Sequence, residues 1–262
     1  MAERTDTAHK VAEVFRAIAG KAEKKYFTSA IILAAGSSTR MNGQSKQFLC
    51  LDGIPVVART VIEFDRSACI DEIIIVAKKD EISLYDGFSE RYGIEKPLKV
   101  VEGGETRQES ARFGSDAVNA KAKFVAIHDA ARCLITQDMI NKVCHGAYLH
   151  EAAILAIKSA DTVKIGDKNA FIESTTDRKI TWQAQTPQVF KTNAFRAAAY
   201  VARDEKFEGT DDASLLEHIR IPVKLVEGSK ENIKITEQVD IYFAQAVLVA
   251  RANDIKDEGS AK

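Results

Sequence analysis

The chain contains 262 residues, of which 45% are hydrophobic and 29% are charged, a composition typical of a folded protein and not of a disordered one. Its 37 basic and 38 acidic side chains leave a net charge of -1, which gives the molecule no overall attraction to nucleic acid or to a membrane surface. We therefore expect neither as a partner, and any anion must be bound by a local cluster of cations.

The four cysteines, at positions 50, 69, 133 and 144, are widely spaced and include no CxxC pair. This spacing favours neither a zinc site nor a disulfide framework, so reduced thiols are expected. No apolar run approaches the length of a membrane span, and the N-terminal residues lack the apolar segment of a signal peptide. We therefore expect a cytoplasmic protein.

Residues 1–27 differ in composition from the rest of the chain. They are rich in alanine, lysine and glutamate, and their apolar residues recur at the spacing of one helical face: Val11, Val14, Phe15, Ile18 and Ala22. We interpret this segment as an N-terminal helical extension, which could dock on the main domain, dock on a partner chain or remain solvated. The main domain is expected to span residues 28–255, and residues 256–262 to form a frayed tail.

From residue 28 onward, short apolar runs alternate with helical stretches. The runs predict buried strands over 31–35, 72–77, 98–101, 124–128 and 152–157, and the patterns between them predict helices over 54–64, 106–118 and 139–149. Pro55 suits the first turn of its helix, where a backbone N–H is not needed. Strands that alternate with helices favour parallel βαβ units, so we predict an α/β fold with a mostly parallel twisted sheet and helices on both faces.

The pattern changes after residue 158. Alternating residues over 162–165 and 171–175, separated by a turn-like stretch, predict a β-hairpin. We interpret about residues 159–181 as an arm inserted after the parallel strands, and a second copy of the chain is the simplest partner for it. The remaining sequence predicts a strand over 182–185, a helix over 211–219, a strand over 223–226 and a closing helix over 237–252.

The sequence from Ala30 to Lys46 has the form of a strand followed by a small, hydroxyl-rich loop. Gly36 allows a tight turn close to a ligand, and the amide groups of a loop that opens toward a helix attract phosphate. Arg40 and Lys46 would add two full positive charges. An ordinary turn with solvated cations is the alternative.

Ligands of open α/β sheets bind beyond the carboxyl ends of the strands, so the residues that follow each predicted strand are the candidates for chemistry. Those positions bring five cations toward one edge, with Asp129 among them: Arg40, Lys46, Arg107, Arg132 and Lys234. Fixed positive charge suits nucleotidyl transfer, in which negative charge develops on phosphate oxygens. Asp129 could hold Mg²⁺ beside a triphosphate or cap a following helix, and Arg132 could instead be a surface cation paired with an acid.

Two common nucleotide-binding motifs are absent. The sequence contains no GxxxxGK[ST] pattern, and no GxGxxG follows the first predicted strand. These absences disfavour a P-loop NTPase and a nicotinamide-dependent oxidoreductase. We interpret His128, at the end of a predicted buried strand, as a hydrogen-bonded structural residue, because attack by an ionised phosphate needs no general base.

Several motifs occur in the order found in a known family. They are LAAGSSTRM (33–41) with KQF (46–48), EGG (102–104) with RQES (107–110), HDAAR (128–132), DT (161–162), QTPQ (185–188), TDDA (210–213) and NIKIT (232–236). This set resembles the 2-C-methyl-D-erythritol 4-phosphate cytidylyltransferases of the non-mevalonate isoprenoid pathway and covers about residues 30–247. The resemblance implies a Rossmann-like nucleotidyltransferase that joins CMP from CTP to 2-C-methyl-D-erythritol 4-phosphate and releases pyrophosphate.

The same resemblance implies roles for individual residues. Those that would bind the nucleotide are Ala34, Ala35, Gly36, Gly103, Gly104 and Ser110. Arg40, Lys46 and Lys234 would be catalytic, and Asp129 would ligate Mg²⁺. Those that would bind the second substrate are Arg132, Thr162, Arg178 and Thr186, with Thr162 and Arg178 reaching a neighbouring subunit's site from the arm of a homodimer.

The chain departs from the family pattern at Cys133, where proline usually follows the arginine of HDAAR, and in residues 1–27, which have no counterpart. A ribitol-5-phosphate cytidylyltransferase would share the fold and the CTP loop, but the RQES stretch favours the methylerythritol enzyme. A non-catalytic nucleotide-binding protein is the alternative of another class. It would be expected to lose some of the cations or Asp129, all of which are present.

Overall fold

The computed structural model describes residues 26–36 and 45–260, with side chains through residue 253. The segment predicted to form an N-terminal helix therefore lies outside the described residues, apart from residues 26 and 27, which precede the first strand in irregular structure. The loop residues 37–44, including Arg40, also lie outside them. Within the described ranges, no helix is both long enough and apolar enough to cross a bilayer.

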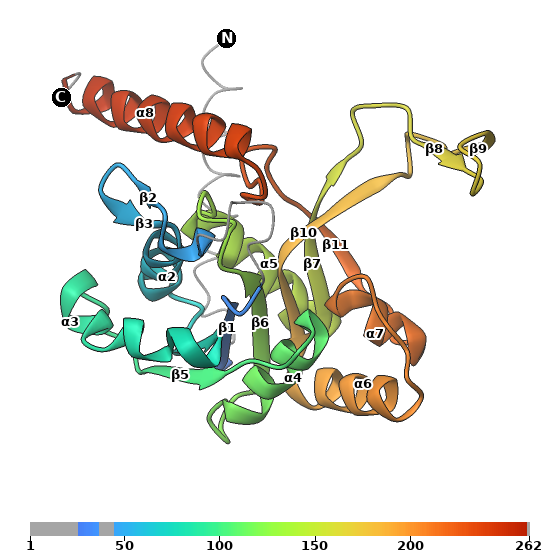
Figure 1. Ribbon diagram of the computed structural model, residues 1–262, viewed down its shortest axis with the longest axis horizontal. Coiled ribbons are helices and arrows are strands. Elements are labelled where there is room, and N and C mark those ends of the chain that lie inside the picture. The colour runs from blue at the N-terminus through green and yellow to red at the C-terminus, as the bar shows by residue number, and fades with distance from the viewer. Residues whose placement is uncertain (1–25, 37–44, 261–262) are drawn as a thin grey trace, which may run out of the picture.

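A seven-stranded sheet forms the centre of the molecule, in the order β11-β7-β10-β6-β1-β4-β5 (Figure 1). The strands are β1 (Thr28–Leu33), β4 (Glu72–Ala77), β5 (Leu98–Glu102), β6 (Phe124–Asp129), β7 (Ala152–Lys158), β10 (Trp182–Lys191) and β11 (Lys224–Glu227). β10 is antiparallel to both of its neighbours, and the other pairs of this sheet are parallel. The mostly parallel α/β fold predicted from the sequence is confirmed.

β1, β4 and β6 are buried along their full length, because helices cover the sheet on both sides. Side chains alternate across the sheet, so neighbouring residues of β1 enter different cores: Ile32 joins one cluster and Ile31 the other. The first cluster includes residues of α2 (Val56–Arg66), α3 (Phe88–Tyr92) and α5 (Gln137–His150). The second includes residues of α4 (Arg107–Ala117), α6 (Thr192–Asp204) and α7 (Asp212–His218).

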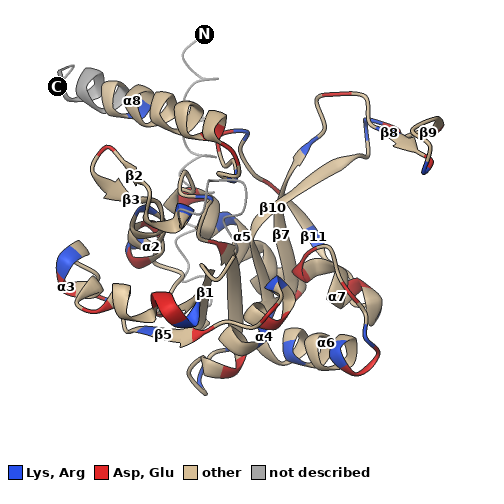
Figure 2. Cartoon of the chain, in the orientation of Figure 1, with Lys and Arg blue, Asp and Glu red and all other residues tan. Residues whose placement is uncertain are grey.

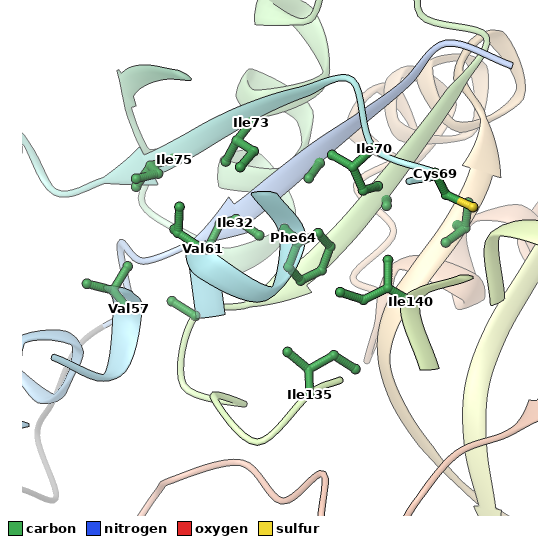
Figure 3. Packing of buried hydrophobic residues seen from close by; sticks show 14 of the residues in the cluster. Ile32, Val57, Val61, Phe64, Cys69, Ile70, Ile73, Ile75, Ile135 and Ile140 are labelled. Carbon is green, nitrogen blue, oxygen red and sulfur yellow. The ribbon is translucent and has the colours of Figure 1, made fainter. Parts of the chain in front are cut away.

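Phe64 of α2 lies in the first cluster, with Ile32 of β1 and Ile140 of α5 nearby (Figure 3). Its side chain is fully buried. The centroid of its ring is 5.0 Å from that of the His128 imidazole in β6. Packing on this face therefore supports the end of the strand that carries Asp129.

The remaining elements complete the described chain. They are the 3-10 helices η1 (Lys46–Phe48) and η2 (Lys79–Tyr85), the strands β2 (Cys50–Leu51) and β3 (Ile54–Pro55), the strands β8 (Lys164–Gly166) and β9 (Ile172–Thr175), and the helix α8 (Gln238–Ser260). Ala244 of α8 packs with Leu51 and Leu134 in a third, smaller cluster. β8 and β9 pair antiparallel and stand away from the main sheet (Figure 1).

Several predicted boundaries shift in the structure. The helix predicted from Ile54 begins at Val56, because Ile54 pairs with Leu51 in the short β2–β3 ladder. The strand predicted to stop at residue 185 continues as β10 to Lys191, and its register shifts between residues 184 and 188, around Pro187. α8 continues past residue 255, where a frayed tail was expected to begin.

α6 is not among the helices predicted from the sequence. The buried face of this helix consists mainly of alanine, with Phe195 as its large apolar residue. Its buried residues recur at the spacing of one helical face, at positions 192, 195, 198, 199 and 202, so the helical period is present in the sequence.

Replacing Phe64 by alanine should lower the free energy of unfolding by about 3–5 kcal/mol, because it leaves a cavity in a closely packed core. Urea denaturation followed by circular dichroism measures this change. Leu149→Ala is the control, since Leu149 is 80% exposed, and it should change stability by no more than about 0.5 kcal/mol. Equal stabilities for the two variants would contradict the assigned packing.

Candidate active site

Two neighbouring clefts open at the carboxyl ends of the central strands. The first has a volume of about 300 Å³, and its lining includes seven of the predicted site residues: Ala35, Gly36, Lys46, Gly104, Ser110, Asp129 and Lys234. The second, of about 250 Å³, adds Arg132 and Thr186. Both clefts are lined by Arg107, Asp129 and Lys234. The clefts therefore meet at one charged cluster.

The turn after β1 is held from behind by a buried glutamine. The amide of Ala34 donates to the carbonyl of Val76 at 2.8 Å, which extends the contact between β1 and β4. Gln47 is 2% exposed and donates from its side-chain nitrogen to the carbonyl of Ala34 and, at 3.4 Å, to that of Gly36. Ala34 is itself buried, so Ala35 and Gly36 form the wall of the cleft.

The loop after β5 fits tightly because it carries two glycines. A Cβ at Gly103 would lie 2.6 Å from the Cβ of Ala35, which is closer than carbon atoms can approach. The amide of Gly104 donates to the Ser110 hydroxyl at 3.1 Å. Thr106 then begins α4 with a capping box that it shares with Glu109. This cap places Arg107 and Ser110 at the cleft.

Asp129, the last residue of β6, is surrounded by three cations. Its Oδ1 accepts from Nε of Arg107 at 3.0 Å, and its Oδ2 lies 2.9 Å from Nζ of Lys234 and 3.7 Å from Nε of Arg132. Burial raises the pKa of this carboxyl, but the three cations outweigh burial and hold the pKa well below its usual range. Asp129 is therefore ionised throughout the physiological range of pH.

The alternative interpretation of Asp129 as a helix cap is wrong, and Arg132 is paired with an acid, Asp129, but is not a surface cation. No helix starts after Asp129: the next one, α5, begins at Gln137 and is capped by Thr136. The Arg132 side chain is only 15% exposed, and its guanidinium donates to the carbonyl of Asn232 at 2.8 Å. Both residues therefore belong to a mostly buried polar site.

His128 is a structural residue, as predicted. It is fully buried, and burial lowers its pKa to about 3, so the imidazole is neutral. Its Nε2 lies 3.3 Å from the carbonyl of Arg132, which can only accept a hydrogen bond, so Nε2 carries the proton and Nδ1 accepts a hydrogen bond from the Thr186 hydroxyl at 3.0 Å. The Thr186 oxygen in turn accepts the amide of Asp129 at 3.1 Å. Thr186 thus links β10 to the end of β6.

Arg107 has a second carboxylate partner that the sequence did not reveal. Its NH2 group donates to Oδ2 of Asp212 at 2.8 Å. Asp212 is 1% exposed and is the first residue of α7. Burial raises the pKa of Asp212, and the contact with Arg107 opposes that shift. The sequence offered two signals: the TDDA motif (210–213) includes this residue, and a helix needs only one of the adjacent acids at 211 and 212 as its cap.

Thr162 and Arg178 line neither cleft. Both are exposed, and the guanidinium of Arg178 lies 3.4 Å from the carbonyl of Ala160. Their segment leads into and out of the β8–β9 hairpin, which extends away from the sheet (Figure 1). Figure 2 shows acidic and basic residues mixed over the outer elements, as the near-neutral net charge of the chain leads one to expect.

The donor set around Asp129 suits Mg²⁺ that takes most of its ligands from elsewhere. Among the residues that the structure describes, no group of three or more His, Cys, Asp or Glu side chains is placed to hold a metal alone. A carboxylate offers about four lone-pair positions, and Arg107 and Lys234 each use one. Mg²⁺ is commonly bound by one or two carboxylates together with water and substrate phosphates, so one carboxylate is sufficient here.

Comparison with known proteins decides between the remaining interpretations. A family model for 2-C-methyl-D-erythritol 4-phosphate cytidylyltransferase matches residues 28–250. The chain belongs to this family. Members of this cytidylyltransferase family catalyse the CTP-dependent reaction that the sequence resemblance implies, so the predicted family, enzyme class and reaction are confirmed.

Relatives within the cytidylyltransferase family match along almost their whole length. The enzyme of that name from Caldanaerobacter subterraneus subsp. tengcongensis is 41% identical over 222 residues, which are 84% of this chain and 98% of the relative. The enzyme from Geobacillus kaustophilus is 40% identical over 223 residues, 85% and 97% of the two chains. The crystal structure of 4-diphosphocytidyl-2C-methyl-D-erythritol synthase from Anaerococcus prevotii has a TM-score of 0.78 at 34% identity and covers 85% of this chain and 96% of that one.

The departure at Cys133 leaves the cytidylyltransferase site intact. Cys133 is buried and packs with Leu134 and Ile235 in the third core cluster. Burial raises the pKa of its thiol to about 11, so it behaves as a small apolar residue. The neighbouring Arg132 keeps its place beside Asp129.

Proposed function

We propose that this chain transfers CMP from CTP to 2-C-methyl-D-erythritol 4-phosphate, giving 4-diphosphocytidyl-2-C-methyl-D-erythritol and pyrophosphate. The observation that carries the proposal is the meeting of two clefts at Arg107, Asp129 and Lys234. A transferase that joins two phosphate-bearing substrates needs two adjacent pockets and a cationic junction between them. Family membership supports the identity of both substrates.

The first cleft is proposed to bind CTP. Small residues allow the backbone to approach a base and ribose closely, which supports nucleotide-binding roles for Ala34, Ala35, Gly36, Gly103, Gly104 and Ser110. Of these, Ala35, Gly36, Gly104 and Ser110 line the cleft, and Ala34 and Gly103 pack behind it. Lys46 and Lys234 line the same cleft and would stabilise the charge that develops at the α-phosphorus. We propose the same role for Arg40.

Asp129 is proposed to ligate Mg²⁺ together with the triphosphate. When bound, the metal would neutralise phosphate charge and orient the α-phosphorus. Arg107 would continue to hold Oδ1 of Asp129, and Lys234 would exchange its contact with Oδ2 for a phosphate oxygen.

The second cleft is proposed to bind the methylerythritol phosphate. Arg132 supplies a cation on this side of Asp129. Thr186 lines the same cleft, and because its hydroxyl already donates to His128 and accepts from Asp129, its proposed contribution is to hold the end of β6 in place. From this cleft the substrate phosphate would attack the α-phosphorus in line, and pyrophosphate would leave. The attacking oxygen is already ionised, which agrees with a neutral, structural His128.

A panel of substrates tests the proposed activity. Purified protein with CTP, Mg²⁺ and 2-C-methyl-D-erythritol 4-phosphate should release pyrophosphate, and omission of Mg²⁺ or replacement of CTP by ATP, GTP or UTP should reduce the rate strongly. Ribitol 5-phosphate should be a poor acceptor. A faster reaction with ribitol 5-phosphate would overturn the assigned substrate.

Lys46→Ala should lower kcat by about 10²–10³-fold, the usual effect of removing one preorganised group that stabilises a developing anion. Steady-state pyrophosphate release measures this. Lys121→Ala is a matched control, because Lys121 is exposed and lines neither cleft. A kcat for Lys46→Ala within threefold of the control would rule out the catalytic role.

The β8–β9 arm, residues 159–181, is proposed to pack against a second copy of the chain. It carries four exposed apolar side chains: Ile165, Phe171, Ile172 and Ile180. Exposed apolar groups on a projecting hairpin support an interface. In such a homodimer, Thr162 and Arg178 would contribute to the partner's second cleft. The four free cysteines support a reducing, cytoplasmic setting for the enzyme.

Mixed dimers test the arm. Lys46→Ala and Arg178→Ala should each be nearly inactive, but a mixture refolded together should regain activity, because one site of each mixed dimer would combine an intact Lys46 with the partner's intact Arg178. Light scattering should give twice the monomer mass of 28.8 kDa. If the mixture stays as inactive as its components, the arm does not serve the neighbouring site.

A further inference from the structure

Asp212 is buried in a way that its own helix does not require. α7 is capped by Asp211, whose side chain accepts the amide of Ser214 at 2.9 Å. Asp211 also accepts from the side chain of Gln188 at 2.8 Å. Asp212 takes part in neither interaction. It is 1% exposed, and its Oδ1 has no hydrogen-bond partner among the described residues. A buried carboxylate with one unsatisfied oxygen is unfavourable for folding alone.

Within the part of the chain that the structure describes, the Asp212 carboxylate makes one side-chain hydrogen bond, with Arg107. The guanidinium of Arg107 spans two acids, with Nε donating to Asp129 at 3.0 Å and NH2 donating to Asp212 at 2.8 Å. Asp129 is already in contact with Lys234 and close to Arg132. Without the charge of Asp212, three cations would face the single carboxylate of Asp129.

We propose that Asp212 is a positioning residue that acts on Asp129 through Arg107: by taking one end of the guanidinium and balancing its charge, it keeps Asp129 available to the magnesium ion that accompanies CTP. This inference rests on the proposed function, because it concerns the metal role assigned to Asp129. Asp212 lines neither cleft, so it is not expected to touch either substrate.

Removal of the Asp212 charge should have opposite effects on two forms of the nucleotide. The site would become more positive, so metal-free CTP would bind as well as before or better. The charge of Arg107 would then be balanced by Asp129 alone, so Asp129 would compete less well for a divalent cation and Mg–CTP would bind less tightly. A general loss of structure would weaken both forms together.

Isothermal titration of the full chain with CTP, in EDTA and in saturating Mg²⁺, tests the proposal without turnover. For the wild type, the ratio of the two dissociation constants measures how strongly magnesium and nucleotide binding are coupled. Asp212→Asn keeps the size of the side chain and an acceptor oxygen for Arg107, and it should reduce this ratio on the order of tenfold. Glu217→Gln, an exposed acid on the same helix, should leave the ratio unchanged.

Asp212→Ser is the second variant, and thermal melting of all variants checks that they are folded. A reduced ratio in both Asp212 variants, with metal-free CTP bound as tightly as by the wild type or more tightly, supports the proposal. A wild-type ratio in folded Asp212→Asn overturns it, as does an equal loss for both forms of CTP. Magnesium-dependent pyrophosphate release by the wild type is measured in parallel. If that release is normal while the ratio does not change, only the role of Asp212 fails; if the wild type shows no magnesium dependence, the metal role of Asp129 fails as well.

Discussion

The ion pair between Arg107 and Asp129 is the interaction on which the site depends. It joins the first turn of α4 to the end of β6. Another nitrogen of the same guanidinium donates to Asp212 and so connects α4 to α7. The cluster contains three cations, Arg107, Arg132 and Lys234, and two buried carboxylates, so it retains one excess positive charge. Because these cations are only partly exposed to water, that charge acts on an anion more strongly than it would on the open surface. A site in which two phosphate groups must approach each other needs an excess of positive charge to offset their repulsion.

The fold holds this cluster in place through its core. Phe64 of α2 packs against the ring of His128, whose Nδ1 accepts the Thr186 hydroxyl, and Thr186 accepts the amide of Asp129. Hydrophobic packing, a neutral imidazole and one hydroxyl therefore orient the carboxylate from behind. This arrangement explains why a histidine at the end of an active-site strand needs no role in proton transfer.

The sequence allowed the sheet and most of the cleft to be predicted, for a simple physical reason. Parallel strands end at one edge, so residues that follow separate apolar runs, such as Gly104, Asp129 and Lys46, converge without any knowledge of their contacts. Asp212 could not be found in this way, because its position depends on how α7 packs after a long connection. Gln47 was missed because a glutamine that binds carbonyls from behind a turn looks like any polar loop residue.

Strand β10 connects the proposed arm to the second cleft. This strand begins at Trp182, directly after the arm, and continues through Thr186 into the centre of the sheet. About 13 Å of extended chain separates those two residues at the usual rise of about 3.3 Å each. The ladder between β10 and β7 is interrupted between residues 184 and 188, so Thr186 lies in an irregular stretch of the strand and is held by its hydroxyl contacts with His128 and Asp129. In the proposed dimer, subunit association and the position of Thr186 would be linked through this one short length of chain.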